Sequence, residues 1–236
     1  MEQVTLDRPP SLTDTVVDHI RDGIIRGTYA PGQPLAEAQL SEKLGTSRGT
    51  VREALRELGS LGLVTRSTHK GAAVSTLTAK DAEEIYTLRA ALESFAARLA
   101  VERGNLDAAA LVVLADRVEA IARAGAAGDV LGMVTADMEF HTALSALSGH
   151  DLLIERLAAI LVHCRRLLFY SDLYQPDFEI VVRRHRDLLV VLRDDDAYQV
   201  ALAIDRHITG PGKDIVAKMI ARERAEGEEG TPSEDA

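Results

Sequence analysis

The sequence has one cysteine, no tryptophan, few aromatic residues and no apolar run of the length that a membrane span needs. Its only cysteine, Cys164, excludes an internal disulfide and fits a reducing cytoplasm. The N-terminal residues MEQVTLDRPP lack the apolar core of a signal peptide. Hydrophobic residues still make up 46% of the 236 positions, and Ala, Leu, Val and Arg are abundant. These features predict a cytoplasmic, mostly helical protein with no membrane contact and enough length for two cores.

Positive charge is scarce overall and concentrated in one segment. The net charge of −10, from 27 Lys and Arg against 37 Asp and Glu, argues against nucleic-acid binding by the whole surface. The acidic excess lies entirely in residues 77–236, because residues 1–76 are neutral. The stretch Lys43–Lys70 is basic, and Glu53 and Glu57 are its only acidic residues. Its basic residues are Lys43, Arg48, Arg52, Arg56, Arg66 and Lys70. A local positive patch of this kind is typical of a surface that contacts phosphate.

Two short helices joined by a tight turn are predicted within Ala36–Leu63. Gly45 gives the backbone the freedom to leave the first helix, and Ser47 is a good N-cap for the second. Apolar residues of the second helix repeat at helical spacing, while its arginines fall on another face: these are Val51, Leu55 and Leu58 against Arg48, Arg52 and Arg56. A helix-turn-helix places such a helix in the DNA major groove. Without its flanks, the pattern would be better explained by an amphipathic helix pair with solvated arginines.

The flanking segments favour a winged helix. A helix is expected over Leu12–Arg26, before the helix-turn-helix. After it, Leu63–Ser67 and Ala72–Leu77 are short segments rich in β-forming or small residues, and the THKG between them can close a hairpin. A helix, a helix-turn-helix and a two-stranded wing together make a winged helix.

Beyond Thr78 the pattern predicts long helices only. Their expected ranges are Ala79–Arg103, Leu106–Ala124, Val130–Leu147, Leu152–Asp172, Phe178–Arg193 and Ala197–Ile208, with Asp214–Arg224 after an interruption. Pro211 should kink or end the last helix, because it lacks the amide that would bond the carbonyl of His207. The expected fold is therefore mainly α. It has a winged helix-turn-helix DNA-binding domain over residues 1–77, an antiparallel all-α bundle for effector binding and dimerisation over 78–225, and a disordered acidic tail over 226–236.

Four polar residues stand on apolar helix faces of the second part. Asp137 and His141 are four residues apart, so both project from the same side of their helix. His185 and His207 each lie among aliphatic residues on later helices. A neutral polar group buried without a partner costs on the order of 2–7 kcal/mol, so one such histidine alone is most simply a hydrogen-bonded core residue. An Asp and three His together would all be satisfied by one divalent metal ion.

Three segments of the first part, IRDGIIRGTYAPGQPL, SRGTVREALRELGSLGLV and HKGAAV, resemble in order the N-terminal domain of GntR-family transcription regulators. The resemblance implies that the start of the recognition helix and the tip of the wing contact a double-stranded DNA operator. By position, the contacting residues are Arg48, Gly49, Thr50, Arg52, His69, Lys70 and Gly71. Arginine can pair with guanine O6 and N7, and glycine allows a close backbone approach. Some relatives carry an arginine where this chain has Ala38.

Residues 80–208 resemble the FCD effector domain of the FadR subfamily of these regulators, through IYTLRAALESFAARLA, DMEFHTAL, RRHRDLL and DRHI. Many members hold a metal ion with one Asp and three His, which by position are Asp137, His141, His185 and His207. Zinc, nickel and manganese all accept this donor set, and we expect zinc. Relatives often carry a glutamate where this chain has Arg184.

The same resemblance implies how a signal is sensed. An octahedral ion with four protein ligands keeps open positions, where a small carboxylate effector can bind. Arg89 matches an arginine that lines the effector pocket in similar proteins; the alternative is a surface residue paired with Glu93 at i,i+4. Most relatives are repressors released by a small carboxylic acid. A homodimer with twofold symmetry would read an inverted-repeat operator.

Two other functions fit part of the pattern. A metal-dependent hydrolase could use the Asp and three His to activate water. However, no further carboxylate is expected on these faces as a general base, and an enzyme has no use for residues 36–77. A metal-free regulator that senses an acyl ligand is the other alternative, and it leaves the four-ligand set without a role.

Overall fold

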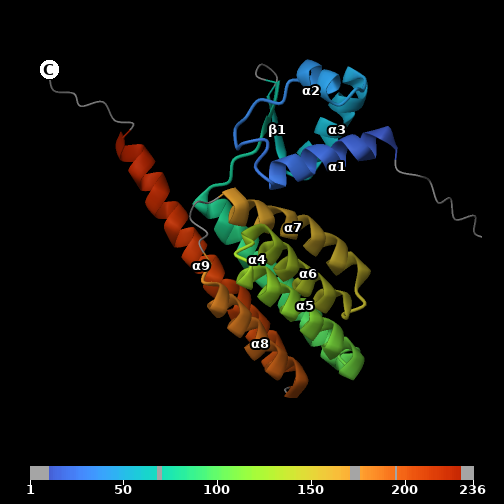
Figure 1. The fold of residues 1–236 in the computed structure, drawn as a ribbon, viewed down its shortest axis with the longest axis vertical. Coiled ribbons are helices and arrows are strands. Elements are labelled where there is room, and N and C mark those ends of the chain that lie inside the picture. Colours follow the sequence, from blue (N-terminus) through green and yellow to red (C-terminus); the bar gives the residue numbers. More distant parts are fainter. Residues whose placement is uncertain (1–10, 68–70, 171–175, 195, 230–236) are drawn as a thin grey trace, which may run out of the picture. The chain divides into compact units, whose positions relative to one another are not determined.

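The computed structural model describes residues 11–67, 71–170, 176–194 and 196–229, and the chain divides into two units between Thr76 and Leu77 (Figure 1). The first unit contains α1 (Leu12–Ile25), α2 (Glu37–Lys43), α3 (Arg48–Ser60), β1 (Val64–Ser67) and β2 (Gly71–Val74). The second contains α4 (Ala79–Glu102), α5 (Ala108–Ala126), α6 (Val130–Ala146), α7 (Asp151–Tyr170), α8 (Phe178–Asp194) and α9 (Ala197–Glu229). A winged helix-turn-helix followed by a helical bundle is the fold class that the sequence predicted, and that prediction is confirmed.

The first unit is organised around one face of α3. Ser47 starts this helix, because its Oγ accepts the N–H of Thr50 at 3.1 Å. The apolar residues of α3 are fully buried, as their helical spacing predicted: Val51, Ala54, Leu55 and Leu58. β1 and β2 pair antiparallel, with Val64 opposite Val74. Since the apolar face of α3 is covered by its own unit, the arginines of the opposite face remain in solvent.

The second unit is a bundle in which α9 lies along α4 and α8 (Figure 1). Its core contains few aromatic side chains, such as Phe140, and many aliphatic ones, such as Leu114, Ile121, Met133 and Leu144. Thr78 begins α4 through a capping box, in which its Oγ1 accepts the N–H of Asp81 and the Asp81 carboxylate accepts the N–H of Thr78. Within the described residues, no helix is long and apolar enough to cross a membrane.

The most deeply buried side of α4 does not carry its leucines. Helical spacing makes Ile85, Leu88, Leu92 and Leu99 the apolar positions of this helix, yet Leu88 is 52% exposed and the other three are only half-buried. The buried side instead carries small residues together with Tyr86, Arg89 and Glu93. Alanines allow the neighbouring helices to approach α4 closely, and α9 makes extensive contact with it. The expectation was wrong for Leu88, because helical spacing identifies an apolar stripe without saying what covers each of its residues.

α9 does not end or break at Pro211, so the expectation that this proline would interrupt the last helix was wrong. The helix runs from Ala197 to Glu229, so it also extends into the range expected to form a disordered tail, while residues 230–236 lie outside the described chain. Pro211 has no N–H for the carbonyl of His207. The helix continues because it is packed along its length: a Cβ at Gly212 would stand 2.7 Å from Cγ of Tyr86, so α9 and α4 meet there at close range. Packing on α4 offsets the lost hydrogen bond.

Candidate metal centre and nucleic-acid interface

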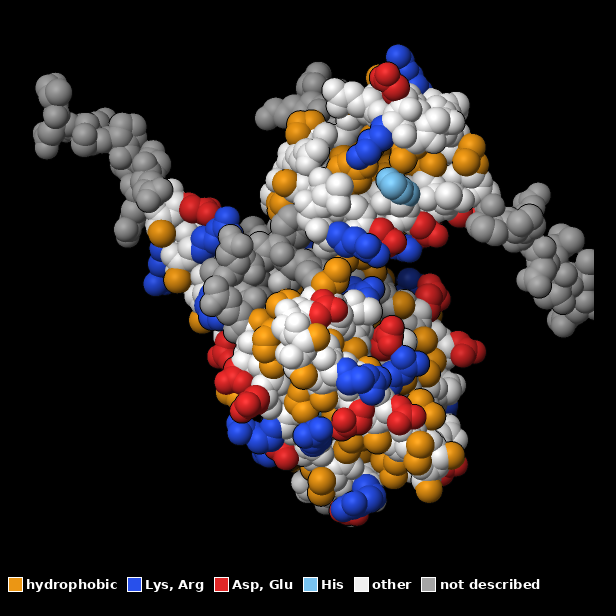
Figure 2. Space-filling view, in the orientation of Figure 1, with side chains coloured by type: hydrophobic (Ala, Val, Ile, Leu, Met, Phe, Trp, Pro, Cys, Tyr) orange, Lys and Arg blue, Asp and Glu red, His pale blue; other side chains and the backbone are white. Residues whose placement is uncertain are grey.

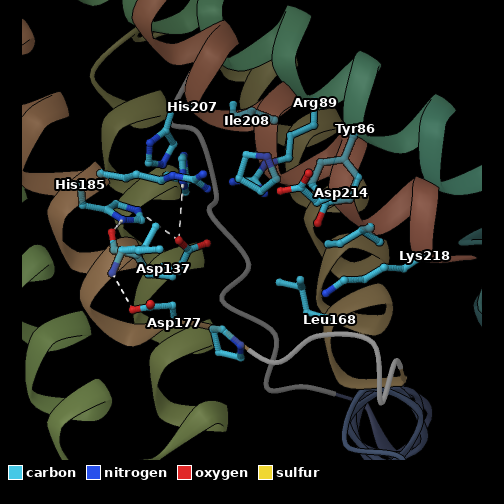
Figure 3. Close-up of a pocket in the computed structure, with 17 residues that line it drawn as sticks. Tyr86, Arg89, Asp137, Leu168, Asp177, His185, His207, Ile208, Asp214 and Lys218 are labelled. Atoms are coloured by element: carbon cyan, nitrogen blue, oxygen red, sulfur yellow. Dashed lines mark hydrogen bonds and ion pairs between the residues drawn. The ribbon is translucent and has the colours of Figure 1, made fainter.

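Three helices bring the four predicted ligands to one place in the second unit (Figure 3). α6 carries Asp137 and His141, α8 carries His185 and α9 carries His207. One ring nitrogen from each histidine lies within 4.8 Å of the other two. Oδ1 of Asp137 lies 3.1 Å from Nε2 of His185 and 4.0 Å from Nε2 of His141. Three imidazoles and one carboxylate therefore converge.

Two hydrogen bonds determine which nitrogen two of these rings offer to the centre. Nδ1 of His185 lies 2.9 Å from the carbonyl oxygen of Val181, which can only accept, so Nδ1 carries the proton. Nδ1 of His141 lies 2.6 Å from Oε2 of Glu93, and an ionised carboxylate also only accepts. In a neutral imidazole the other nitrogen then holds a lone pair. His141 and His185 thus both offer Nε2 as a metal ligand.

The donor set fits a divalent ion. Nε2 of His185 is buried and has no hydrogen-bond partner among the described residues, although Oδ1 of Asp137 is only 3.1 Å away. A ring lone pair and a carboxylate oxygen repel each other at this distance unless a cation or a proton lies between them. Imidazole nitrogen and carboxylate oxygen are ligands that zinc, nickel and manganese accept.

The electrostatics of the site keep His207 and Asp137 in the protonation states that bind metal. Burial lowers the pKa of His207, and the nearby His185 and His141 lower it further, so this pKa lies well below its ordinary value. Burial alone would raise the pKa of Asp137, but the His185 and His141 rings and Arg89 outweigh it and hold that pKa well below its usual range. A neutral imidazole and an ionised carboxylate are the forms that bind metal.

Arg89 and Glu93 form a buried ion pair beside the histidines. Nε of Arg89 donates to Oε1 of Glu93 at 2.6 Å, and the two side chains are only 5% and 1% exposed. The alternative expectation for Arg89 was therefore right about its partner and wrong about its location, which is the interior. Nη2 of Arg89 is buried without a hydrogen-bond partner among the described residues, and Arg89 lines a cavity. Burial would lower the pKa of Arg89, but Glu93 reverses the effect, so the guanidinium stays charged.

That cavity has a volume of about 240 Å³ and opens beside the four predicted ligands. Apolar side chains from α7, α8 and α9 form much of its wall: Leu168, Ile180, Val181, Ile208, Pro211 and Ile215. Exposed charged residues also line it, namely Asp177, Arg184, Asp214 and Lys218. In the view of Figure 3, Asp137 and His185 stand at one side, and Asp214 and Lys218 at the other. The space is suited to a small organic molecule with one polar end.

Glu93 is the site residue that sequence reasoning missed. No carboxylate beyond the ligand set was expected near the centre, yet Glu93 contacts His141 directly. Its i,i+4 spacing to Arg89 was visible in the sequence. Its contact with α6 was not, because only the packing of α4 against α6 brings Glu93 and His141 together.

The candidate DNA-contacting residues of α3 stand on its exposed first turn. Arg48 and Gly49 are exposed, and the Thr50 hydroxyl lies 2.9 Å from Oγ of Ser47. In the wing, Gly71 is exposed and has φ of +74°, a conformation that favours glycine. The other two wing residues predicted to contact DNA, His69 and Lys70, lie outside the described residues.

Arg52 is held in place by α2. Its Nε donates to Oε1 of Glu37 at 3.0 Å and its Nη2 donates to Oε2 at 2.7 Å, while the Arg52 side chain remains 60% exposed. A bidentate pair of this kind restricts the guanidinium to one orientation. Glu37 therefore positions Arg52 on the exposed face of α3.

Comparison with known proteins gives two family matches. Residues 12–74 match the family described as "Bacterial regulatory proteins, gntR family", and residues 84–210 match the FCD domain. The chain is 30% identical over 189 residues to the HTH-type transcriptional regulator YdhC of Bacillus subtilis strain 168, covering 79% of this chain and 83% of YdhC. It is 28% identical over 198 residues to a probable D-xylose utilization operon transcriptional repressor of Paenarthrobacter nicotinovorans, covering 82% and 86%.

The fold is also similar to that of a solved structure. E. coli McbR/YncC superposes with a TM-score of 0.74 at 25% identity, over 90% of this chain and 99% of that one. The similar proteins are transcription regulators and not enzymes. The chain therefore belongs to the GntR family of bacterial transcription regulators, in the group that carries a C-terminal FCD domain.

Proposed function

We propose that this regulator is a cytoplasmic repressor of the FadR subfamily, released from its operator when a small carboxylic acid binds at a divalent ion in the FCD domain. Residues 1–77 bind DNA, and residues 78–225 bind the effector and dimerise. Asp137, His141, His185 and His207 hold the ion, with zinc as the first expectation and nickel or manganese as alternatives. The bound ion supplies positive charge to attract the effector's carboxylate.

The observation that carries this proposal is the group of imidazoles with assigned lone pairs. Hydrogen bonds to Glu93 and Val181 fix the protons of His141 and His185 on Nδ1, so that both Nε2 atoms are free to ligate. Structural core histidines have no need of such an arrangement, because a buried polar atom ordinarily has a hydrogen-bond partner. Among the described residues, Nε2 of His185 has only the carboxylate of the second predicted ligand, Asp137, within reach, at 3.1 Å.

The charges of the buried groups indicate an anionic effector. Arg89 and Glu93 compensate each other, so the Asp137 carboxylate leaves this cluster with one negative charge before an ion binds. A divalent ion changes that net charge to +1. A monocarboxylate would then neutralise this cluster, and Nη2 of Arg89 offers it a donor.

The DNA-binding half of the proposal rests on the exposed first turn of α3 and on the wing. Arg48, Gly49, Thr50 and Arg52 would enter the major groove, while His69, Lys70 and Gly71 would approach the DNA from the wing. An effector that prefers one arrangement of two DNA-binding units changes operator affinity by that difference in binding free energy.

Dimerisation is supported by two large apolar side chains of α4 that the described part of the chain leaves exposed. Leu88 is 52% exposed and Phe95 is 39% exposed on this helix. Arg98 lies over the Phe95 ring, with Cζ 5.1 Å from its centroid, so the surface is apolar with a charged edge. A second copy of the chain on this face gives a homodimer that reads an inverted repeat.

The metal site is tested by elemental analysis of the purified full chain. Wild type should contain about one divalent ion per chain, and His207→Ala should contain much less. His19→Ala is the matched control, since His19 is exposed on α1 and belongs to the other unit. Stoichiometric metal in His207→Ala would show that the ligands are assigned wrongly.

The DNA interface is tested with an operator selected from random duplexes by the wild-type chain. Arg52→Ala should lose most operator affinity and reduce the slope of log affinity against log salt by about 1 if it contacts one phosphate. Arg56→Ala is the control on the same helix, because Arg56 pairs with Glu53 one turn further along. Equal affinities for wild type and Arg52→Ala would contradict the assigned recognition surface.

A further inference from the structure

Glu93 has two carboxylate oxygens, and each accepts a hydrogen bond from a different part of the site. Oε1 accepts from Nε of Arg89 at 2.6 Å, and Oε2 accepts from Nδ1 of His141 at 2.6 Å. The side chain is 1% exposed, so water does not compete for either oxygen. We propose that Glu93 is a positioning residue that fixes the metal-binding tautomer of His141 and, through the same carboxylate, holds Arg89 toward the cavity. This inference rests on the proposed metal site.

The argument for His141 is one of donors and acceptors. A neutral imidazole carries one proton, and the ring can ligate an ion through Nε2 only when that proton is on Nδ1. An ionised carboxylate cannot donate, so Glu93 stabilises the Nδ1–H form. Carboxylates that bond a ligating histidine in this way orient the ring and raise its basicity.

The argument for Arg89 is one of restricted motion. Glu93 binds Nε, on one edge of the guanidinium, and leaves Nη2 as a buried donor without a partner among the described residues. The same Arg89 side chain lines the cavity beside His141 and His207. Glu93 therefore connects the ion-binding ring and the anion-binding guanidinium in one rigid unit.

Glu93→Gln gives a sharp test because it keeps the shape and removes one acceptor. Arg89 is always charged and only donates, so it will keep the amide oxygen of Gln. The amide nitrogen will then face His141 as a donor, and His141 must move its proton to Nε2 to accept. That proton occupies the position where an ion would bind.

The first measurement is the tautomer of His141 by nitrogen NMR of the metal-free full chain at pH 7.5. Wild type should show His141 protonated on Nδ1, and Glu93→Gln should show it protonated on Nε2. A purely structural role for Glu93 would leave the tautomer unchanged. Wild-type His141 protonated on Nε2, or an Nδ1–H form kept in Glu93→Gln, would overturn the proposal.

The second measurement is Zn²⁺ affinity, by competition with a chromophoric chelator. Glu93→Gln should bind Zn²⁺ about 10- to 100-fold more weakly than wild type, as is typical when a partner of a ligating histidine is removed. Glu119→Gln is the control, because Glu119 is an exposed partner of Arg186 in the same unit, at 2.9 Å. Unchanged Zn²⁺ affinity in Glu93→Gln would contradict the assigned role.

A double variant separates positioning from simple loss of stability. In Glu93→Gln with Arg89→Met, no guanidinium competes for the amide oxygen, which can then accept from Nδ1–H of His141. Zn²⁺ affinity should partly recover relative to Glu93→Gln alone, a non-additive result. A double variant that binds no better than Glu93→Gln would overturn the proposal. If wild type binds none of Zn²⁺, Ni²⁺ and Mn²⁺, the proposed function is wrong. The tautomer of His141, measured without metal, still tests the role of Glu93 in that case.

Discussion

At the scale of single residues, the site depends on which atom of each ring or carboxylate faces which partner. His141 and His185 are both buried, and each has its Nδ1 assigned by an acceptor that cannot donate. Cys164 shows the opposite case. Burial raises the pKa of its thiol to about 11, so the thiol is protonated at neutral pH and packs in the core.

Gly49 gives a prediction at this scale. It is exposed in the first turn of α3, and a Cβ there would stand 3.5 Å from Oγ of Ser47, an ordinary contact. Gly49→Ala should therefore stabilise the fold by up to about 1 kcal/mol, because alanine favours the helix. It should nevertheless weaken operator binding, since the methyl group would separate α3 from DNA. Urea unfolding and operator titration measure the two effects.

Gly59→Ala is the comparison for that variant. Gly59 lies near the other end of α3, where a Cβ would stand 3.6 Å from the backbone oxygen of Val64. It should change stability without weakening operator binding. Tighter or equal operator binding by Gly49→Ala would show that the first turn of α3 does not approach DNA closely.

At the scale of elements, α9 illustrates how packing overrides a local signal. The segment Gly210-Pro211-Gly212 predicted an interruption, and the helix continues through it. Pro211 lines the cavity, and Gly212 admits the Tyr86 ring of α4. Pro211 and Gly212 therefore have separate roles that the sequence did not distinguish.

The two glycines beside Pro211 provide a matched pair of variants. Gly212→Ala would place a Cβ 2.7–2.9 Å from the Tyr86 side chain and should destabilise the fold by about 1–3 kcal/mol through overpacking. At Gly210 a Cβ meets nothing within 4 Å, so Gly210→Ala should be neutral or stabilise by up to about 1 kcal/mol. Thermal unfolding compares them. A smaller loss of stability in Gly212→Ala than in Gly210→Ala would contradict the close contact of α9 and α4.

The capping box of α4 predicts a pH dependence. Hydrogen bonds from the Thr78 side chain and backbone lower the pKa of Asp81. A carboxyl with a lowered folded-state pKa stabilises the fold above its unfolded pKa of about 3.9, and the effect is lost as the pH falls through the folded value. Wild type should thus be more stable than Asp81→Asn at pH 6, and the difference should shrink below about pH 4.

Denaturant unfolding of both proteins from pH 6 to pH 3 measures this difference. Asp18→Asn is a control in α1, because Asp18 is exposed and forms a surface pair with Arg21 at 2.9 Å. Such pairs contribute little to stability, so its difference from wild type should be small at every pH. An Asp81→Asn difference that grows as the pH falls would contradict the assigned cap.

At the scale of the whole molecule, the division between Thr76 and Leu77 separates two surfaces of different character. Figure 2 shows charged side chains of both signs among hydrophobic ones on the drawn face of the second unit. The acidic excess of the chain lies in that unit, which is proposed to bind the effector, whereas the first unit is neutral and contains the basic stretch Lys43–Lys70. The negative charge of the second unit is repelled by DNA phosphates, so we expect DNA binding by the winged helix of the first unit.

Metal removal gives a prediction for the molecule as a whole. An ion that binds only the folded second unit stabilises that unit by about 2.7 kcal/mol at a hundredfold excess over its dissociation constant. Addition of a chelator should therefore increase amide hydrogen exchange in α6, α8 and α9 and leave α1 and α3 unchanged. Faster exchange in both units, or in neither, would contradict a metal site confined to the FCD domain.

The sequence by itself determined the classes of element and the residues that carry chemistry. Ser47 and Thr78 began helices where they were expected, because N-capping depends only on a hydroxyl and the next three residues. The apolar face of α3 was also predictable, since a single stripe must be buried against the rest of a small unit. The basic segment and the Asp and His residues were visible as composition and spacing.

Tertiary structure alone decided which faces meet. Leu88 of α4 stayed in solvent, while Glu93 came to lie against His141 and Tyr86 against Gly212. These contacts join residues far apart in the chain, and helical periodicity holds no information about the partner of a face. A carboxylate that reads as half of a surface pair therefore became, through packing, the group that sets the tautomer of a candidate metal ligand.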